Sequence, residues 1–285
     1  MRLVQYRILT RILEKVEVPE YIHAFEKNKS IPKMANLHIR KKIVISLDIK
    51  DFFHSIKQHS LFDLFKEIGF TDGPARTLSE VCTYKAYVPQ GALTSPKISN
   101  IIAAKTFGPL IHDFCVKHKM SLSIYADDVT VSIKETNLSI SEIISTLSEF
   151  IVRFGFRINN QKTKVMRAYQ RQWVCGVVVN DKVNLLRKER LELRAIVHNI
   201  SKNGLDVEAA KNNISGDEFR NIMQGRLNWY KQLNKDLADK LIDKFKLSIG
   251  SQEAQQQNLL REDSEKLLAS SKVLTSSKKV VETRV

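Results

Sequence analysis

SLSIYADDVTVS, residues 121–132, says more about the architecture of this chain than any other stretch. Residues with a preference for strands flank Ala126-Asp127-Asp128 on both sides with a period of two, a pattern that predicts a tight β-hairpin. Two adjacent carboxylates would then lie at its tip. Adjacent carboxylates repel each other, so they are stable only in water or around a cation. Taken alone, an Asp-Asp pair is more often a solvated turn, because Asp is common in turns.

A second strand is predicted upstream, at Ile43–Ile49, with the sequence IVISLDI. Its one acid, Asp48, lies near the end of an apolar run, where a carboxylate is costly unless it is paired or binds a cation. If the hairpin joins the same sheet, Asp48, Asp127 and Asp128 converge. Three carboxylates suit a pair of Mg²⁺ ions that activate a hydroxyl and neutralise phosphate charge during phosphoryl or nucleotidyl transfer.

Helical spacing of apolar residues surrounds these strands and predicts an α+β fold, an antiparallel sheet with helices on one face. The predicted helices are 3–16, 60–69, 75–84, one long helix over 97–119 with a kink at Gly108-Pro109, 139–154, 187–200, 216–233 and 236–247. Residues 17–42 are expected to be irregular, and Trp173–Asn180 is expected to be one strand. The predicted domains are 1–185, a helical bundle at 186–250, and a flexible tail at 251–285.

The net charge of +15 is unevenly distributed along the chain. Residues 1–50 contain 11 basic and 5 acidic residues, residues 51–154 contain 10 and 11, and residues 155–250 contain 19 and 10. A near-neutral centre between basic flanks is typical of a protein that grips a polyanion, although a basic surface with no partner would look the same. No long apolar run predicts a membrane segment, and three widely spaced cysteines favour a reducing cytoplasmic location.

Five motifs in order resemble those of reverse transcriptases over roughly residues 1–235. They are LDIKDFF at 47–53, VPQGALTSPKISN at 88–100, YADD at 125–128, GFRINNQKTK at 155–164 and WVCGVVV at 173–179. The strongest resemblance is to bacterial retron-type enzymes of the group II intron and retron lineage. MANLH at 34–38 is similar to the retron Asn-Ala-x-x-His signature with Met first, and VCG at 174–176 is similar to Val-Thr-Gly with Cys in place of Thr.

This resemblance implies a right-hand polymerase fold, with a palm, partial fingers and a C-terminal helical thumb. Asp48 and Asp127 would bridge two Mg²⁺ ions, with Mn²⁺ as the implied substitute. Asp128 would complete the cluster, and the Ile49 carbonyl would be a further metal ligand. The activity implied is RNA-directed DNA synthesis, in which a primer hydroxyl attacks the α-phosphate of a dNTP.

The resemblance also implies the residues of a nucleotide pocket: Ile49, Asp51, Phe52, Phe53, Gln90, Gly91 and Lys162. The backbone amides at 51 and 52 would cradle the triphosphate. Phe53 would stand under the sugar and exclude a 2′-OH, although without the resemblance it is equally a core aromatic. Lys162 would either protonate the leaving pyrophosphate or only hold its charge, and both roles stay open.

Contacts with primer and template are implied for a further set of residues: Tyr125, Ala126, Trp173, Val174, Cys175, Gly176 and, in the thumb motif GRLNWY at 225–230, Arg226. The implied partners are a structured non-coding RNA that serves as template and primer, dNTPs, the RNA–DNA hybrid and an effector protein, with no membrane. The implied biological role is defence against phage.

Related enzymes carry several dozen residues ahead of the point that matches Met1, a part that holds most of the fingers. Three explanations stay open: the fingers are minimal, another chain supplies them, or the sequence is a form shortened at the N-terminus. Two alternatives follow. One is a group II intron-type reverse transcriptase, which the absence of an endonuclease signature disfavours. The other is a non-catalytic RNA-binding remnant, which the retained Asp48, Asp127 and Asp128 disfavour, because unpaired buried carboxylates are a burden without a metal.

Overall fold

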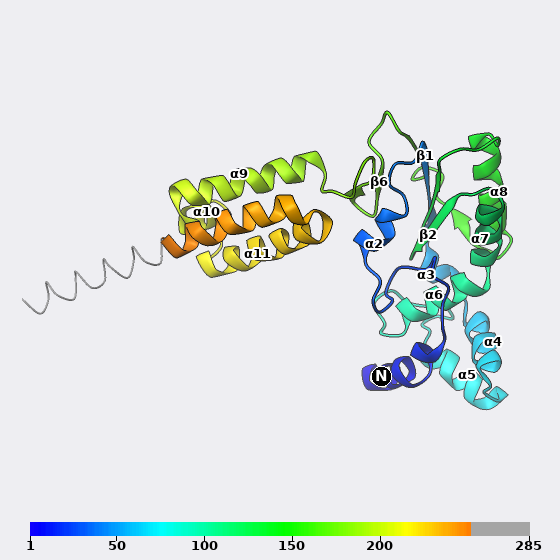
Figure 1. Cartoon of the computed structure of the whole chain (residues 1–285). Coiled ribbons are helices and arrows are strands. Elements are labelled where there is room, and N and C mark those ends of the chain that lie inside the picture. Colours follow the sequence, from blue (N-terminus) through cyan, green and yellow to red (C-terminus); the bar gives the residue numbers. More distant parts are fainter. Residues whose placement is uncertain (252–285) are drawn as a thin grey trace, which may run out of the picture. The chain divides into compact units, whose positions relative to one another are not determined.

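The computed structural model describes residues 1–251 (Figure 1). The chain divides into two compact units, one of residues Met1–Asn184 and one that begins at Leu185. Of the tail predicted at 251–285, only Ser251 falls within the described part, and it is helical. In the described residues, no helix combines the length and the apolar character that a membrane crossing requires.

An antiparallel sheet forms the centre of the first unit. β2 (Ser121–Tyr125) pairs with β3 (Asp128–Ile133), which pairs with β1 (Ile43–Lys50), and β1 also pairs with β4 (Arg157–Ile158) and β5 (Lys164–Arg167). The predicted hairpin at 121–132 and the predicted strand at 43–49 are therefore both confirmed, and they lie in one sheet. The expected antiparallel α+β architecture is confirmed as well.

Alternation along the strands gives this sheet two different faces. Leu47, Ile124 and Val131 belong to the apolar core, and successive side chains on a strand point to opposite faces. The opposite face of the same strands therefore carries Ser123, Thr130 and Ser132 together with the acids. The core face is covered by α7 (Phe107–Lys117) and α8 (Ile140–Val152), which lie along it in Figure 1. The helices thus cover one face and leave the polar face for other contacts.

The helix expected over 97–119 is two helices, α6 (Ser95–Lys105) and α7, separated at Thr106. The predicted kink at Gly108-Pro109 was wrong in position. Pro109 stands in the first turn of α7, where its missing N–H is tolerated, but its ring would clash with the carbonyl of Lys105 if one helix continued. The chain therefore breaks before the proline. A Cβ on Gly108 would lie 2.6 Å from the Ala103 carbonyl oxygen, which explains the glycine.

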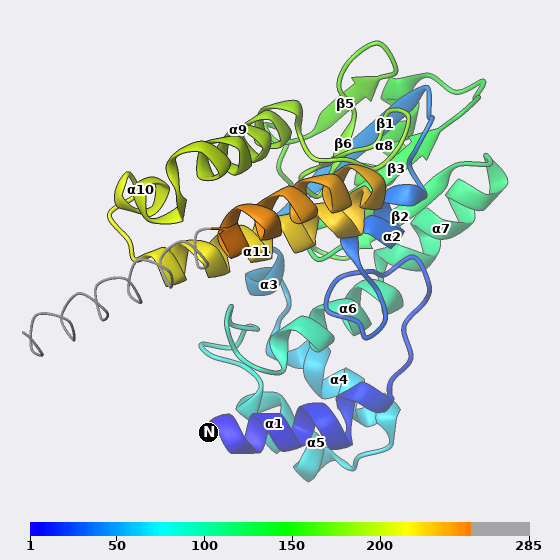
Figure 2. The ribbon, with the colours of Figure 1, turned by 60° about the vertical axis from the view of Figure 1, so that its left-hand side comes forward.

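The remaining elements of the first unit are short helices and a small hairpin. Figure 2 shows α1 beside α5, which it contacts, and α4 also packs on α5. The bounds are α1 (Arg2–Arg11), a 3-10 turn at Leu13–Lys15, α2 (Ile31–Asn36), α3 (Phe52–Ser55), α4 (Gln58–Ile68) and α5 (Asp72–Val81). α2 lies inside 17–42, which was expected to be irregular. Ser30 caps it by accepting a hydrogen bond from the backbone N–H of Lys33.

The single strand expected at Trp173–Asn180 is a two-stranded hairpin, β6 (Trp173–Val174) and β7 (Val177–Val178). Cys175 and Gly176 form its two-residue turn, with φ of 45° and 82°. Positive φ at both central residues is the type I′ geometry, which matches the twist of the two strands. A continuous apolar run can be one strand or two, and only the glycine signalled the turn.

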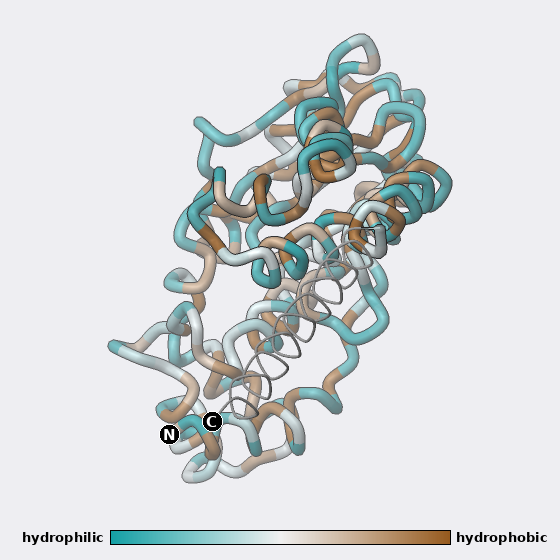
Figure 3. Tube along the Cα trace, turned by 90° about the vertical axis from the view of Figure 1, so that its left-hand side faces the viewer, coloured by the Kyte–Doolittle hydropathy of each residue, from teal (hydrophilic) through white to brown (hydrophobic). Residues whose placement is uncertain are grey.

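The second unit is a helical bundle. It contains α9 (Arg187–Asn203), α10 (Leu205–Ala210), α11 (Gly216–Leu233) and a further helix over residues 235–251. Apolar and polar positions alternate along these helices (Figure 3), and the apolar positions are buried inside the bundle. The most deeply buried side chains of α9 and α11 are Leu193, Val197, Ile200, Met223, Leu227 and Tyr230.

His38 ties α2 to the polar face of the sheet. Its Nδ1 lies 2.7 Å from the Ser132 hydroxyl on β3, and its Nε2 lies 2.8 Å from the Ser123 hydroxyl on β2. The ring is fully buried, and burial, together with the positive charge of Lys41, lowers the pKa of His38 to about 3. A neutral imidazole has one donor and one acceptor, which match these two hydroxyls.

We expect the free energy of unfolding to decrease as the pH falls from about 6.5 towards 3, because the unfolded chain binds a proton on His38 that the folded chain does not. The contribution of this one group is about 1.4 kcal/mol per pH unit. His23, whose pKa is lowered to about 4, acts in the same direction, and Asp128, whose pKa is raised, acts in the opposite one.

The variant His38→Gln keeps an amide donor and acceptor but does not titrate. Urea unfolding of wild type and variant between pH 7 and 4 should give a shallower pH dependence for the variant. Equal slopes would show that His38 is not neutral and buried in solution.

Candidate active site

The hairpin tip is held against the end of β1. Asp128 is paired with Tyr125 on β2 and with Asp48 on β1, and the N–H of Ile49 donates to the Asp127 carbonyl oxygen at 2.8 Å. Ala126 and Asp127 form the two-residue turn, with a φ of 53° at Ala126, as at the first central position of a type II′ turn. Directly opposed residues of an antiparallel pair share a face, so the side chains of Asp48 and Asp128 lie together on the polar face.

Each of these two carboxylates already has a polar partner. Asp128 Oδ1 accepts hydrogen bonds from the hydroxyls of Ser46, at 2.9 Å, and Thr130, at 3.2 Å. Burial raises the pKa of Asp128, and the carboxylates of Asp127 and Asp48 raise it further, while the two hydroxyls oppose the shift. Asp48 Oδ1 accepts a hydrogen bond from Lys162 Nζ at 3.1 Å.

Lys162 supplies positive charge to this group of acids. Hydrogen bonding and charge from Asp48 raise the pKa of Lys162, and Asp127 adds to the effect. The ammonium is more than half exposed, so it can leave Asp48 at little cost. It is therefore an exposed counter-ion at the edge of the carboxylates.

The three acids share one end of the sheet, but they do not close around a common point. In the part of the chain that the structure describes, no group of three or more His, Cys, Asp or Glu side chains is arranged to hold a metal ion. Asp128 faces Ser46 and Thr130, and Asp48 faces Lys162. The donors nevertheless fit a hard divalent cation in kind, since carboxylate and carbonyl oxygens are its preferred ligands. Burial is the main cause of the raised pKa of Asp128, and repulsion from Asp127 and Asp48 adds to it; such a cation would relieve this repulsion.

The residues implied for the nucleotide pocket occupy different environments. Asp51 has a left-handed conformation, with a φ of 51°, and its carboxylate lies 3.4 Å from Arg157 Nη2. Phe52 is buried in the core, and the half-buried Phe53 packs beside it with 5.8 Å between ring centroids. Gln90 and Gly91 are exposed in a loop, and among the described residues neither has a hydrogen bond or ion pair with the three acids. The structure thus brings Lys162 into contact with the acids, whereas Gln90 makes no hydrogen bond to them in the described part of the chain.

The β6–β7 turn lies near the carboxylates. Burial raises the pKa of Cys175 to about 12, and the charges of Asp128 and Asp127 contribute, which places the thiol within electrostatic reach of both. Trp173 is covered by Lys164, whose Nζ lies 4.0 Å from the ring centroid. Val174 is buried, and Gly176 is exposed. Arg226 belongs to the second unit, where its guanidinium lies 2.8 Å from the Glu192 carboxylate.

The structure adds several residues to this region that belong to none of the predicted sites. Ser46 and Thr130 contact Asp128, and period-two spacing from Asp48 and Asp128 could have indicated both. Arg157 meets Asp51 from 106 residues away, which no local pattern indicates. The ring of Phe25 lies 6.3 Å from that of Tyr125, although Phe25 is 52% exposed and has a φ of 59°. A bulky residue in that conformation is strained, and strain of this kind clusters at functional sites.

Comparison with known proteins places these residues within a recognised family. The model of the family described as reverse transcriptase (RNA-dependent DNA polymerase) matches residues 1–220. The retron Ec86 reverse transcriptase of Escherichia coli is 30% identical over 204 residues, which cover 70% of this chain and 62% of that protein. The retron Mx65 reverse transcriptase of Myxococcus xanthus is 28% identical over 259 residues, which cover 85% of this chain and 58% of that protein.

The chain therefore spans about three fifths of the length of these two curated relatives. Among solved structures, telomerase from Candida albicans in complex with a fragment of telomeric RNA has a TM-score of 0.48 at 12% identity, over 87% of this chain and 53% of that one.

Proposed function

This chain belongs to the reverse transcriptase (RNA-dependent DNA polymerase) family, and from that premise we propose that it is a retron-type RNA-directed DNA polymerase. It would extend a primer on a structured RNA template by adding dNTPs. The observation that carries the proposal is the pairing of Asp48 with Asp128 at the hairpin tip, with the Asp127 backbone bonded to Ile49. That pairing supports a carboxylate site at the point where the family motifs LDIKDFF and YADD meet.

Asp48, Asp127 and the Ile49 carbonyl are proposed to hold divalent cations, Mg²⁺ or Mn²⁺, with Asp128 next to them. When bound, these ions would activate the primer hydroxyl and neutralise charge on the phosphate. Asp128 is proposed to help to align the site. Its carboxylate is fixed by the Ser46 and Thr130 hydroxyls, and its position opposite Asp48 keeps the β1–β3 register that aligns the site.

Lys162 is proposed to exchange partners during the reaction. In the structure its ammonium contacts Asp48, and it would move to the phosphates of an incoming nucleotide when Asp48 engages a cation. Two roles remain open for it there, proton donor to the leaving pyrophosphate or holder of its charge. Arg157, which forms an ion pair with Asp51, is a second exposed cation beside the same end of β1. Its guanidinium also suits the binding of nucleotide phosphates.

Primer extension tests the proposal directly. The purified chain is incubated with a DNA primer annealed to an RNA template, dNTPs and Mg²⁺, and products are resolved by length. We expect extension that requires the RNA template and the divalent ion. Intact RNA binding without extension would favour the RNA-binding remnant. The group II intron alternative, the defence role and the effector protein stay predictions.

Phe53 is proposed to exclude ribonucleotides. Replacing it by Ala should raise the incorporation of rNTPs relative to dNTPs by about tenfold or more, since the ring that would block the 2′-OH is removed. Single-nucleotide extension with each dNTP and rNTP pair measures the ratio. Phe62→Ala, which also truncates a partly buried ring, serves as the control and should leave the ratio unchanged. If both variants show the wild-type ratio, Phe53 is a core aromatic only.

A further inference from the structure

Phe25 is an exposed aromatic residue that the fold holds in a strained conformation. Its side chain is 52% exposed, and its φ is 59°. Such a φ is an outlier for a bulky residue, and it persists only where the surrounding structure enforces it. Packing in the core does not explain the conformation, because half of the side chain stays in solvent. The structure around Phe25 therefore shows what keeps the ring there.

Both neighbours of Phe25 in the chain are anchored to α6 by buried polar side chains. Asn100 donates to the carbonyl oxygen of Ala24 and, at 2.8 Å, to the carboxylate of Glu26. Lys97 Nζ donates to both carboxylate oxygens of Glu26, and Lys97 and Asn100 are only 8% and 2% exposed. A buried ion pair adds little net stability, because the loss of hydration of both charges opposes their attraction. What the network does achieve is to fix the exposed ring between its two anchored neighbours.

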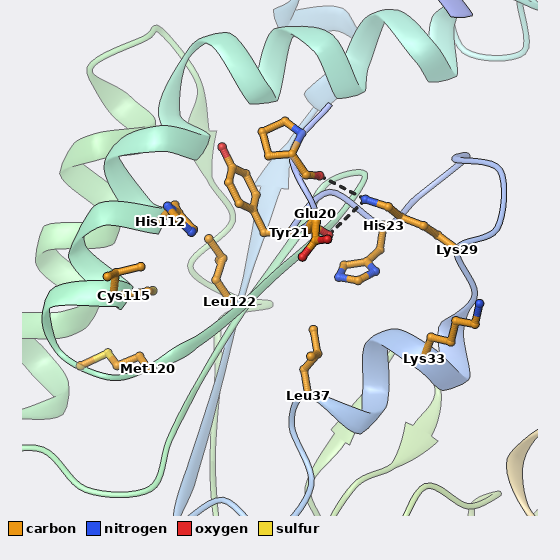
Figure 4. A pocket seen from close by; sticks show the side chains of 12 residues that line it. Glu20, Tyr21, His23, Lys29, Lys33, Leu37, His112, Cys115, Met120 and Leu122 are labelled. Carbon is orange, nitrogen blue, oxygen red and sulfur yellow. Dashed lines mark hydrogen bonds between the residues drawn. The ribbon is translucent and has the colours of Figure 1, made fainter. Parts of the chain in front are cut away.

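The segment ahead of Phe25 is joined to the outer edge of β2 (Figure 4). The N–H of Ile124 donates to the Tyr21 carbonyl oxygen at 2.7 Å, and the N–H of His23 donates to the Ile124 carbonyl oxygen at 2.8 Å. Lys29 Nζ donates to three carbonyl oxygens of the same segment and holds its shape. Phe25 follows two residues after His23, so its position relative to β2 is fixed from both sides.

The ring of Phe25 extends a row of side chains that crosses the polar face of the sheet. Asp48 is opposite Asp128, and Asp128 is opposite Tyr125, so these three side chains share that face. The ring of Phe25 lies 6.3 Å from the ring of Tyr125, at 40° to it. Neighbouring strands are about 4.8 Å apart, so the segment beyond β2 lies roughly 14 Å from β1. The row therefore has the acids at one end and an exposed apolar ring at the other.

Phe25 is also close to the loop implied for the nucleotide pocket. Together with Leu93 and Pro96 it lines a cavity of about 510 Å³. Leu93 belongs to the loop that carries Gln90 and Gly91 and leads into α6. The ring thus has the acidic hairpin on one side and the surroundings of this loop on the other.

The chemistry of the proposed reaction decides which strand would meet the ring. The primer hydroxyl has to reach the cations proposed at Asp48 and Asp127, so the primer end lies over the acids. The strand paired with it, which continues the row towards Phe25, is then the template. An RNA–DNA hybrid of A-form geometry has one deep, narrow groove and one wide, shallow groove that displays sugars and base edges. A ring on an open face of a sheet fits the shallow groove, whereas contact with phosphates would call for a cation.

We propose that the ring of Phe25 contacts the template strand of the RNA–DNA hybrid in its shallow groove, close to the primer end. This inference rests on the proposed function, because it takes the primer hydroxyl to react at Asp48 and Asp127. It adds a residue outside the five sequence motifs to the surface that holds the hybrid. The strained backbone and the buried network keep the ring exposed on this face instead of in the core.

The test places a single methyl group on the hybrid. A fluorescein-labelled RNA template is annealed to a DNA primer that ends in a dideoxynucleotide, and the next dNTP with Mg²⁺ fixes the register without synthesis. Anisotropy measures the affinity while a 2′-O-methyl group is placed at each template nucleotide near the primer end in turn. Because 2′-hydroxyls line the shallow groove, at one of these positions the methyl group should collide with the ring. Binding by the wild type should then weaken by about fivefold or more, the effect of losing the contact of a half-exposed ring.

The variant Phe25→Asn removes the ring, and Asn adopts a positive φ readily. It should bind the unmodified hybrid about fivefold more weakly than the wild type, and the methyl group should have no effect on it. Phe25→Tyr keeps the ring and should respond to the methyl group as the wild type does. The matched control is Phe154→Asn, since Phe154 is 41% exposed and follows α8, which covers the core face of the sheet. It should bind every hybrid as the wild type does.

Thermal unfolding of Phe25→Asn should occur no lower than in the wild type, because the substitution relieves the strained backbone and removes a half-exposed ring. If that variant does not fold, Phe25→Gly carries the same test, since glycine suits this φ. A methyl effect that is the same in the wild type and in the folded variant overturns the proposal and leaves the ring as a support for Tyr125. Methyl effects that depend on Phe25 only when the group is on the primer strand also overturn it.

The inference and the proposed function can fail separately. The binding measurement needs no catalysis, whereas primer extension by the wild-type chain reports on the proposed function alone. Extension without any coupling between Phe25 and the template methyl group overturns only the role of Phe25. Coupling without extension supports the template contact and overturns the polymerase activity of the isolated chain.

Discussion

Replacing Asp127 by Asn is expected to lower the rate of DNA synthesis by about a hundredfold to a thousandfold or more, while the protein stays folded. The carboxylate is exposed at the hairpin tip, so its loss removes negative charge from the proposed cation site. Losing one preorganised electrostatic group commonly costs that much in rate. The contact that fixes the tip is the backbone bond from Ile49 N–H to the Asp127 carbonyl, which the substitution retains.

Single-turnover primer extension measures this effect, with RNA binding and thermal unfolding as checks on the folded state. Asp181→Asn is the matched control, because Asp181 is also an exposed acid in a turn of the first unit. It should extend primers at the wild-type rate. Near wild-type synthesis by a folded Asp127→Asn protein would show that Asp127 does not belong to the active site. It would also contradict the convergence of the family motifs on the hairpin.

The second large effect concerns stability. Lys97→Met is expected to lower the free energy of unfolding of the first unit by about 3–5 kcal/mol, the usual cost of leaving one partner of a buried ion pair alone. Lys97 Nζ lies 3.0 and 2.9 Å from the two carboxylate oxygens of Glu26, and the two side chains are only 10% and 15% exposed. Asn100 also donates to Glu26, at 2.8 Å, so the carboxylate depends on both partners.

Urea unfolding can be followed for the first unit alone. In a Trp229→Phe background, Trp173 is the remaining tryptophan, and it lies in the first unit. Lys105→Met, on the same helix, breaks a pair with Glu67 whose side chains are 43% and 57% exposed, and should cost less than about 1 kcal/mol. The double variant Glu26→Leu with Lys97→Met should recover much of the loss. Equal effects of the two lysine substitutions would show that the Glu26 pair is solvated.

The Glu26 network also bears on activity, because it holds the segment that presents Phe25. Asn100 donates to the Ala24 carbonyl, and Lys97 fixes Glu26, so both neighbours of Phe25 are anchored to α6. Such anchoring keeps a strained residue in place. Its ring then stays beside Tyr125 at the hairpin. Loss of the network is therefore expected to disturb the hairpin as well as the stability.

Sequence alone was sufficient for features that depend on near neighbours. Period-two alternation identified the 121–132 hairpin, and a nearly unbroken apolar run identified the strand that ends near Asp48. Apolar spacing identified most helices, including 216–233 with its observed bounds. The order of the motifs indicated the family that comparison then showed. The periodicity signals each lie within a short window, in which backbone geometry decides which face a side chain takes.

Only the tertiary structure decided how distant residues meet. The register that sets Asp48 opposite Asp128 joins residues 80 apart, Lys162 reaches Asp48 across 114 residues, and His38 bridges two strands 85 and 94 residues away. The structure also showed that the acids face hydroxyls and an ammonium, and that the exposed ring of Phe25 lies beside Tyr125. Such contacts depend on packing between elements, which local periodicity does not encode, because the same alternating strand can pair in several registers until its neighbours are in place.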